Sequence, residues 1–448
     1  MLDIMKYQGI LLPAEIETAK MSGDLDKAQE LINRWMKDDK VPEAMKKRLQ
    51  IEQEILGRIP DEYPFSEEEA LEMIRQEIPD FTMEELREWE DCGAAGWIVR
   101  NGTKYLQSRF YASMKKVYPE IRERAGGEPS DSSLLDRNIA DMKKNGRASW
   151  HVQLKASLKI RDEAFKKGKV RVHLPVPAAC ANMKNIRILA MSHDGAYIAD
   201  ESSVSRTVYF EKDLTENETF WVEFSYDSCV EYNDPRPEDV TGVTDEYTSE
   251  QEPQIVFTPL IKALCRELSG DETNPLVLAR RFYDFVTKHV VYSFMPEYLT
   301  LGVIPDYCAS RLKGDCGVQA LLFITLCRCA GIPAKWQSGR FVTPDTVGNH
   351  DWAMFKVEPF GWMFADCSFG GSAYRAGCYE RHDYYFGNLD PFRLASCNEL
   401  LAEFDPPKKH WRIDPFDNQR GEAEFEDRGL TRQELEMDCK VIRMEKYE

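Results

Sequence analysis

The stretch that decides the fold of this chain is RLKGDCGVQALLFITLCRCAGIPAKW, residues 311–336. Apolar residues recur at helical spacing after Cys316, which predicts a helix with one buried stripe. Asp315 stands directly before this helix, and Gly331 and Pro333 follow it. Glycine favours the position after a helix and proline cannot continue one. The pattern therefore predicts a buried helix with a cysteine in its first turn.

Cys316 differs from the other cysteines by this position. A thiol at a helix N-terminus lies near unpaired backbone N–H groups and the positive end of the helix dipole, and both favour the nucleophilic thiolate. Of the twelve cysteines, only Cys316 has this context. No C-x-x-C pair occurs, so we expect no metal site and no cofactor. The remaining cysteines are expected to be reduced and structural, among them Cys327, Cys329, Cys367, Cys378 and Cys397.

Two predicted strands follow the helix and carry a histidine and an aspartate. Residues 348–359 contain His350, and residues 360–371 contain Asp366. A hairpin between them brings the two side chains roughly opposite each other, on one face only if the register allows it. Asp366 would then accept a hydrogen bond from one imidazole nitrogen while the other nitrogen faces Cys316. The predicted roles are Cys316 as nucleophile, His350 as general base and acid, and Asp366 as orienter.

These motifs resemble the transglutaminase-like superfamily. G-D-C-G before an apolar helix ending in A-G-I-P-A is similar to its nucleophile region, and H-D-W and G-W-x-x-x-D are similar to its His and Asp segments. The resemblance covers about 274–371, roughly a fifth of the chain. It implies a papain-like α+β core and thiol acyl transfer. Family members include cross-linking transglutaminases, cysteine peptidases, peptide N-glycanases and inactive scaffolds, and the missing C-x-x-C pairs count against the glycanases.

The rest of the chain predicts a multidomain α+β protein. Residues 1–144 form a helical N-terminal region with a small hairpin. Within it Ser66 is a candidate N-cap, Thr82 and Glu85 fit a capping box, and one helix is expected from about 108 to 124. Alternating apolar and polar residues in 145–232 predict an antiparallel β-sandwich. Residues 233–257 are a linker or extended strap, and 258–448 form the transglutaminase-like, papain-like α+β domain with a C-terminal extension. The aromatic tail of this extension is expected to pack on the catalytic core.

Composition limits the partners. The chain has 448 residues, 43% of them hydrophobic, and a net charge of −19. Nucleic acid and anionic membranes require a basic face, so neither is expected as a partner. The sequence also has no apolar run of transmembrane length and no secretion signal, which predicts a cytoplasmic protein. An acidic chain would favour basic peptides, although net charge locates no patch.

The sequence predicts a cysteine peptidase or amidase that hydrolyses a peptide or amide bond through a Cys316 thioester. Two alternatives stay open: a catalytically silent scaffold that binds a partner protein, and a protein cross-linking transglutaminase. The backbone N–H of Cys316 is the expected first donor to the oxyanion. Candidates for the second donor are Tyr292, Tyr307 and Trp336. His382 and Asp383 are either a cleft feature or part of the packing.

Overall fold

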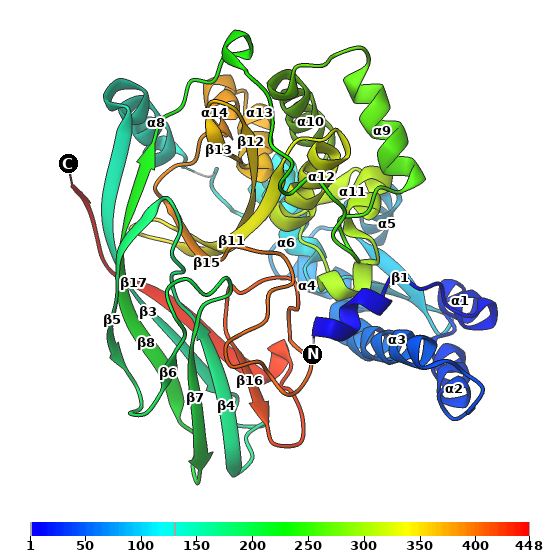
Figure 1. Ribbon diagram of the computed structural model, residues 1–448. Coiled ribbons are helices and arrows are strands. Elements are labelled where there is room, and N and C mark those ends of the chain that lie inside the picture. Colours follow the sequence, from blue (N-terminus) through cyan, green and yellow to red (C-terminus); the bar gives the residue numbers. More distant parts are fainter. Residues whose placement is uncertain (1, 130, 448) are drawn as a thin grey trace.

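A β-sandwich and a mixed helix-and-sheet domain form the two large parts of the molecule (Figure 1). The computed structural model describes residues 2–129 and 131–447. Helices α9–α13 and the strands β11–β13 lie together in the upper half of the view, and the sandwich lies below and to the left. The arrangement confirms a multidomain α+β fold. Within the described residues, no helix is long and apolar enough to cross a membrane.

The N-terminal region is helical, as predicted. The N-cap of α2 is Asp24, whose side chain accepts from the Lys27 N–H. The capping boxes of α4 and α5 pair Ser66 with Glu69 and Thr82 with Glu85. The elements here are η1 (Leu2–Tyr7), α1 (Ala14–Met21), α2 (Leu25–Met36), α3 (Glu43–Glu62), α4 (Glu67–Arg75), α5 (Met83–Asp91), β1 (Trp97–Arg100), β2 (Thr103–Leu106), α6 (Phe110–Val117), α7 (Pro119–Arg124) and α8 (Ser133–Asn145).

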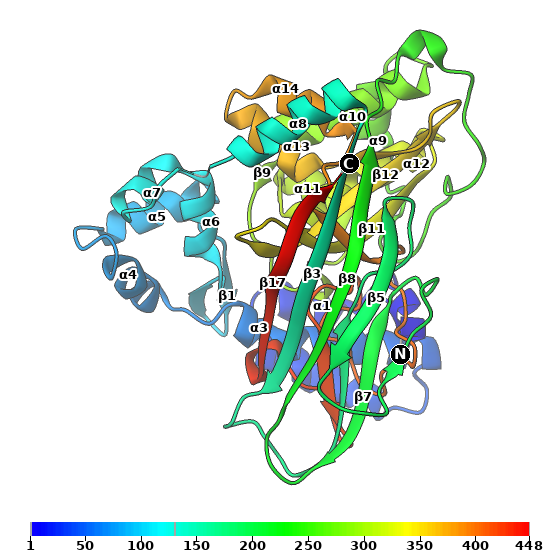
Figure 2. The same cartoon turned by 90° about the vertical axis from the view of Figure 1, so that its left-hand side faces the viewer.

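One long helix expected over 108–124 is divided into α6 and α7. Tyr118 is extended, with φ −105° and ψ 108°, because a residue before proline is disfavoured in the helical region and Pro119 follows. The hairpin of β1 and β2 turns at Asn101 and Gly102, which have φ of 49° and 81°, as a two-residue turn of this type requires. Figure 2 shows α4–α7 as a lobe that projects from the rest of the molecule.

The β-sandwich consists of two four-stranded sheets, in the orders β17-β3-β8-β5 and β16-β4-β7-β6. Alternate residues of β3, from Val152 to Ile160, are at most 1% exposed, and they pack against the facing sheet. The predicted alternation is therefore confirmed. The strands are β3 (Arg147–Ile160), β4 (Gly168–Pro175), β5 (Met183–Met191), β6 (Tyr197–Ile198), β7 (Thr207–Leu214) and β8 (Thr219–Glu231).

The two remaining sandwich strands come from the far end of the chain. β16 (Glu422–Phe425) pairs with β4, and β17 (Leu435–Tyr447), which follows η4 (Arg432–Glu434), pairs along almost the whole length of β3. The red β17 lies beside β3 at the sheet edge in Figure 2. The aromatic tail thus continues past the catalytic sheet and completes both sandwich sheets, because β3 and β4 would otherwise present unpaired edges.

The transglutaminase-like region is a five-stranded sheet, β14-β13-β12-β11-β15, packed against helices. Helix α12 is buried along nearly its full length. The elements are α9 (Pro259–Ser269), α10 (Pro275–His289), β9 (Val291–Tyr292), η3 (Tyr298–Leu301), α11 (Ile304–Arg311), β10 (Lys313–Gly314), α12 (Cys316–Cys329), β11 (Ala334–Val342), β12 (Val347–Val357), β13 (Gly361–Ala365), α13 (Cys367–Arg375), α14 (Tyr379–Tyr384), β14 (Phe386–Gly387) and β15 (Arg393–Cys397).

The segment before α9 is an extended strap with one short turn of helix, η2 (Pro237–Asp239). Its backbone bonds to the end of β12, where the N–H of Thr241 donates to the carbonyl of Glu358. The hydroxyl of Tyr247 donates to Glu399. These contacts hold the strap against the catalytic sheet.

Candidate active site

Cys316 is the first residue of α12, as the sequence predicts. Asp315 is the N-cap, and its side chain accepts from the Val318 N–H and from the Tyr298 hydroxyl, at 3.3 and 2.5 Å. Gly317 follows because a β-carbon there would lie 2.3 Å from the Tyr298 hydroxyl and 2.8 Å from Asp351 Oδ2. The helix start is therefore packed too tightly for any other residue. The thiol itself is half-buried.

The Cys316 thiol donates a hydrogen bond to Asp351 Oδ2, at 3.2 Å. Burial raises the pKa of this thiol well above its ordinary value, and the Asp351 and Asp315 carboxylates raise it further. This opposes the thiolate expected from the helix dipole, because two carboxylates lie beside the thiol. This conformation favours the protonated thiol.

His350 and Asp366 form a close pair on the catalytic sheet. The register joins Ala353 to Ala365, so His350 and Asp366 fall on the same face. His350 Nε2 lies 2.7 Å from Asp366 Oδ2, and the two residues are 3% and 0% exposed. Asp366 Oδ1 also accepts from the Phe369 N–H and caps α13. The predicted hairpin thus has the register that allows this pair.

Arg393 favours the ionised form of Asp366 in the His350–Asp366 pair. This fully buried guanidinium donates to Asp366 Oδ2 at 2.8 Å and to Asp390 Oδ1 at 2.9 Å. Burial alone would raise the pKa of Asp366, but His350 and Arg393 outweigh it and hold that pKa well below its usual range. Burial lowers the pKa of His350, and Asp366 offsets this only in part. These shifts favour a neutral imidazole beside an ionised carboxylate, and in that state Nε2 would be the nitrogen that donates to Asp366.

The structure brings together two of the three predicted residues. His350 contacts Asp366, whereas Cys316 contacts Asp351, the next residue along β12. Neighbouring residues of a strand point to opposite faces. Among the described residues, no hydrogen bond joins Cys316 to His350, and no described contact occupies His350 Nδ1. The triad roles therefore stay predictions.

A cleft of about 860 Å³ opens beside the thiol. Three parts of the chain form its walls. The N-terminal lobe contributes Arg109 and Lys116, the catalytic domain contributes Cys316 and Asp351, and the C-terminal residues contribute Asp414 to Glu422 and the start of β17. Cys439 of β17 also lines it, so Cys316 is one of two cysteines at the cleft. All twelve cysteines are unpaired.

Of the predicted candidates for the second oxyanion donor and for a further cleft residue, only one lines the cleft. Tyr292 lines the cleft with Cys316. Trp336 is 1% exposed and its indole N–H is buried without a partner, and Tyr307 lies in α11 outside the cleft lining. His382 is buried against α10, where its Nε2 lies 2.9 Å from Thr287 Oγ1. His382 thus belongs to the packing of α14 and not to the cleft.

Comparison with known families identifies the central part of the chain. Residues 262–367 match the transglutaminase-like superfamily. The chain carries a domain of this superfamily. The match ends one residue beyond Asp366 and includes Cys316 and His350. The transglutaminase-like domain supports a thiol-dependent enzyme in general terms.

Solved structures of limited similarity were also found. A candidate cysteine protease from Cytophaga hutchinsonii is 13% identical, covers 66% of this chain and 91% of its own, and has a TM-score of 0.37. The periplasmic domain of TgpA from Pseudomonas aeruginosa is 13% identical, covers 55% and 96%, and has a TM-score of 0.28. The same domain bound to ethylmercury is 14% identical, covers 52% and 94%, and scores 0.27. No curated protein matches the chain.

Several site residues of the transglutaminase-like domain were not predicted. Asp351 stands inside the H-D-W motif, and its position beside His350 was a signal that could have been used. Arg393 lies 27 residues after Asp366, in a segment whose sequence gives no sign of a buried cation. Gln419, which donates to Asp351 Oδ1, belongs to a C-terminal loop that only the tertiary fold brings to the cleft. Within the described residues, no group of three or more His, Cys, Asp or Glu side chains could hold a metal ion.

Proposed function

We propose that this protein is a thiol-dependent acyl-transfer enzyme, favoured as a cysteine peptidase or amidase, with Cys316 as its nucleophile. The observation that carries the proposal is the buried His350–Asp366 pair, at 2.7 Å, next to the strand residue that contacts the thiol. A neutral imidazole beside an ionised carboxylate is the state that a general base requires. The superfamily match of residues 262–367 supports the same chemistry.

The reaction follows from these groups. The Cys316 proton passes to His350 Nδ1 while the sulfur attacks the amide carbonyl carbon, and a C–S bond forms. The C–N bond then breaks, and His350 returns the proton to the leaving amine. Water attacks the thioester, its proton passes to His350, and the acid leaves as the thiol is restored. Asp366 stays ionised throughout and holds the imidazolium that forms in each half.

The oxyanion needs two donors. The first-turn N–H groups of a helix have no intrahelical partner, so the Cys316 N–H is available at the reacting carbon. Tyr292 is the favoured second donor because it lines the cleft beside the thiol. Burial raises the pKa of Tyr292 well above its ordinary value, and Cys316 raises it further. The hydroxyl therefore keeps the proton that it would donate.

One movement is needed before the reaction starts. The thiol has to leave Asp351 Oδ2 and turn towards His350. The two acceptors belong to consecutive residues of β12, which point to opposite faces of the strand, so the thiol has to change side as well as partner. We propose that substrate entering the cleft displaces the Cys316–Asp351 hydrogen bond.

The proposal is tested by incubating a peptide library with the wild type and with Cys316→Ala, and reading the products by mass spectrometry. Cleaved peptides that form with the wild type alone support the peptidase. A mass change of deamidation or amine incorporation indicates amidase or cross-linking chemistry at the same thiol. Cys439→Ala is the matched control, since it removes the other cleft cysteine, and it should retain activity. Turnover in Cys316→Ala, or loss of turnover in Cys439→Ala, would contradict the assignment.

A silent scaffold is the second candidate, and one observation favours it. The thiol is hydrogen bonded to a carboxylate and its pKa is raised, which is unlike an activated nucleophile. Under this alternative neither peptides nor amines are processed, and His350→Gln changes nothing that the wild type does. Under the enzyme proposal His350→Gln lowers kcat by roughly 100-fold or more, the usual contribution of a general base, with a smaller effect on KM.

A further inference from the structure

The cleft beside Cys316 contains basic side chains without acidic partners. Five of them line it: Arg109, Lys116, Arg340, Arg420 and Arg432. Elsewhere in the described residues the structure forms many ion pairs, yet none of these five has one. In a chain with a net charge of −19, uncompensated cations gathered in one cleft require an explanation.

Arg340 gives the clearest evidence. It lies on β11 and is only 6% exposed, and within the described residues no hydrogen bond or ion pair engages its guanidinium. Its position in the register, opposite Asn349, puts it on the same face of the sheet as Asp351 and at the cleft wall. The guanidinium nitrogens face the open cleft, since none of them is a buried atom without a partner. An anion in the cleft would supply the missing acceptor.

The cations also repel one another. Burial lowers the pKa of Arg420 to about 10, and nearby Arg432 and Arg109 contribute to the decrease. Arg109 is held in place by its position over the Phe294 ring, 3.5 Å from the ring centroid, and Lys116 lies 4.0 Å from the centroid of Tyr292. The fold thus holds like charges close together before any ligand arrives, which is the preorganisation that anion binding uses.

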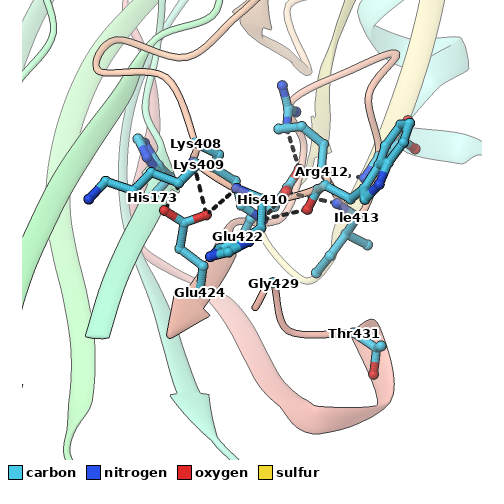
Figure 3. A network of polar contacts seen from close by, with 12 residues as sticks. His173, Lys408, Lys409, His410, Arg412, Ile413, Glu422, Glu424, Gly429 and Thr431 are labelled. Atoms are coloured by element: carbon cyan, nitrogen blue, oxygen red, sulfur yellow. Dashed lines mark hydrogen bonds and ion pairs between the residues drawn. The ribbon is translucent and has the colours of Figure 1, made fainter. Parts of the chain in front are cut away.

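The loop that carries Arg420 is fixed to the sandwich. Glu422 accepts from Lys408 at 2.9 Å and from Arg412 at 2.6 Å, and Glu424 accepts from the backbone of Lys409 and His410 (Figure 3). These contacts hold the chain on either side of residues 413–421 against β16. Arg420 therefore approaches the cleft from a braced segment.

The carboxylates of the cleft do not cancel this charge. Glu297 and Glu422 are already paired, with Arg58 and with Lys408 and Arg412. Burial raises the pKa of Asp351 and Asp417 well above its ordinary value, so both favour the neutral form. Glu436 pairs with Arg161 and Asp438 with Lys440. Asp315 and Asp414 accept only from neutral donors, the Tyr298 hydroxyl and the Phe416 N–H, which do not offset a carboxylate charge, so two carboxylates face the five cations that have no ion pair.

We propose that this cleft binds an acidic peptide segment, whose Asp and Glu side chains pair with Arg340, Arg420 and Arg109 on either side of the bond presented to Cys316. The inference rests on the proposed function, because the bound peptide is the substrate that Cys316 would attack. The binding step itself needs no catalysis. Arginine pairs with carboxylates in a two-pronged geometry, and a cleft of about 860 Å³ fits side chains better than a nucleic acid strand.

The test measures binding to Cys316→Ala, which cannot turn substrate over. Fluorescence anisotropy is recorded with a labelled peptide of alternating glutamate and alanine, and with matched peptides containing glutamine or lysine. We expect the glutamate peptide to bind at least about tenfold more tightly than the glutamine peptide, and the lysine peptide not to bind. Arg340→Gln and Arg420→Gln should each weaken only the glutamate peptide, by about tenfold. Arg340→Lys keeps the charge and should retain most of the affinity.

Arg137→Gln is the control, because Arg137 is an exposed arginine of α8 outside the cleft lining, and it should change no affinity. Equal binding of the three peptides, or stronger binding of a single-stranded oligonucleotide of equal charge, would overturn the inference. Selective binding by Cys316→Ala without any turnover by the wild type would contradict only the proposed enzyme. Turnover without preference for acidic peptides would contradict only the proposed specificity.

Discussion

Asp351 and Asp366 are both buried aspartates at the catalytic sheet, yet their pKa values are shifted in opposite directions. Asp366 contacts a histidine and an arginine, and these hold its pKa well below the usual range. Asp351 contacts a thiol and a carboxamide, and burial together with Asp315 raises its pKa well above that range. Burial is common to both, so the partners decide the charge. The ionised Asp366 orients His350, whereas Asp351, with its raised pKa, accepts the hydrogen bond of the Cys316 thiol.

A third buried carboxylate extends the comparison and gives the largest expected effect. Glu422 is 4% exposed and holds two buried cations, Lys408 and Arg412. Glu422→Gln leaves both without an ionised partner, so we expect a loss of about 4 kcal/mol in the free energy of unfolding, measured by urea denaturation. Glu426→Gln is the control, since Glu426 is exposed on the same segment, and it should lose less than about 1 kcal/mol.

The pH dependence of the same residue follows from the sign of its shift. Burial alone would raise the pKa of Glu422, but Arg412 and Lys408 lower it to about 2 from an ordinary 4.5. The stabilisation is complete above the ordinary value and is lost as the pH falls towards 2. Wild type and Glu422→Gln should therefore approach equal stability in acid. A constant difference over the whole range would contradict the assignment.

Asp366→Asn removes the ionised carboxylate of the two aspartates compared above. It removes the ionised partner of His350 and Arg393, but Arg393 keeps Asp390. We expect a loss of about 3 kcal/mol in the free energy of unfolding, together with loss of turnover because the wrong imidazole tautomer is favoured. Arg393→Lys should also reduce activity, since lysine cannot bond both aspartates in the same geometry. Unchanged stability in Asp366→Asn would show that the pair carries no charge.

Asp351→Asn should increase the free energy of unfolding, whereas Asp366→Asn should decrease it. The raised pKa means that the native state resists ionisation of Asp351, so its presence lowers stability as the pH rises above the ordinary carboxyl value. Removing the charge should therefore stabilise the protein by on the order of 1 kcal/mol near pH 7, and by nothing in acid where Asp351 is protonated in both states. Paired denaturation curves at acidic and neutral pH check this. A variant that is destabilised at neutral pH would contradict the assignment of a neutral carboxyl group to Asp351.

The smallest expected effect is a change in the pH dependence of alkylation at the Cys316 thiol. In the wild type, alkylation of Cys316 by iodoacetamide should reach half its maximal rate at a pH above the ordinary thiol value, because burial, Asp351 and Asp315 oppose ionisation. Asp351→Asn should move this midpoint to lower pH, because it removes the carboxylate that forms beside the thiol as the pH rises. Peptide mapping by mass spectrometry separates Cys316 from Cys439, whose rate serves as the internal control and should not change.

Local patterns predicted much of this molecule. The helix start at Cys316, the N-cap at Ser66, the capping box at Thr82 and the alternation along β3 all depend on residues close together in the chain, and the structure has them where they were expected. The His350–Asp366 pair required only a hairpin register. One local signal was overlooked: Pro119 divides the helix that was expected to run from 108 to 124.

The charge state of the thiol could not be predicted from local sequence patterns. It depends on Asp351, which Gln419 contacts from a loop 68 residues further along the chain. The charge of Asp366 likewise depends on Arg393, on another strand. Periodicity reports which residues are buried but not which buried charges meet. The membership of β16 and β17 in the sandwich is a long-range pairing of the same kind.

The closure of the sandwich by β17 has a consequence for biosynthesis. During translation Cys316 is made roughly a hundred residues before Gln419 and Arg420, and earlier still than the strand that pairs with β3. An incomplete nascent chain therefore has a thiol but no finished cleft wall beside it. The cleft is completed only after nearly all of the described chain has been made, so the order of synthesis delays any chemistry at Cys316 until the rest of the molecule is present.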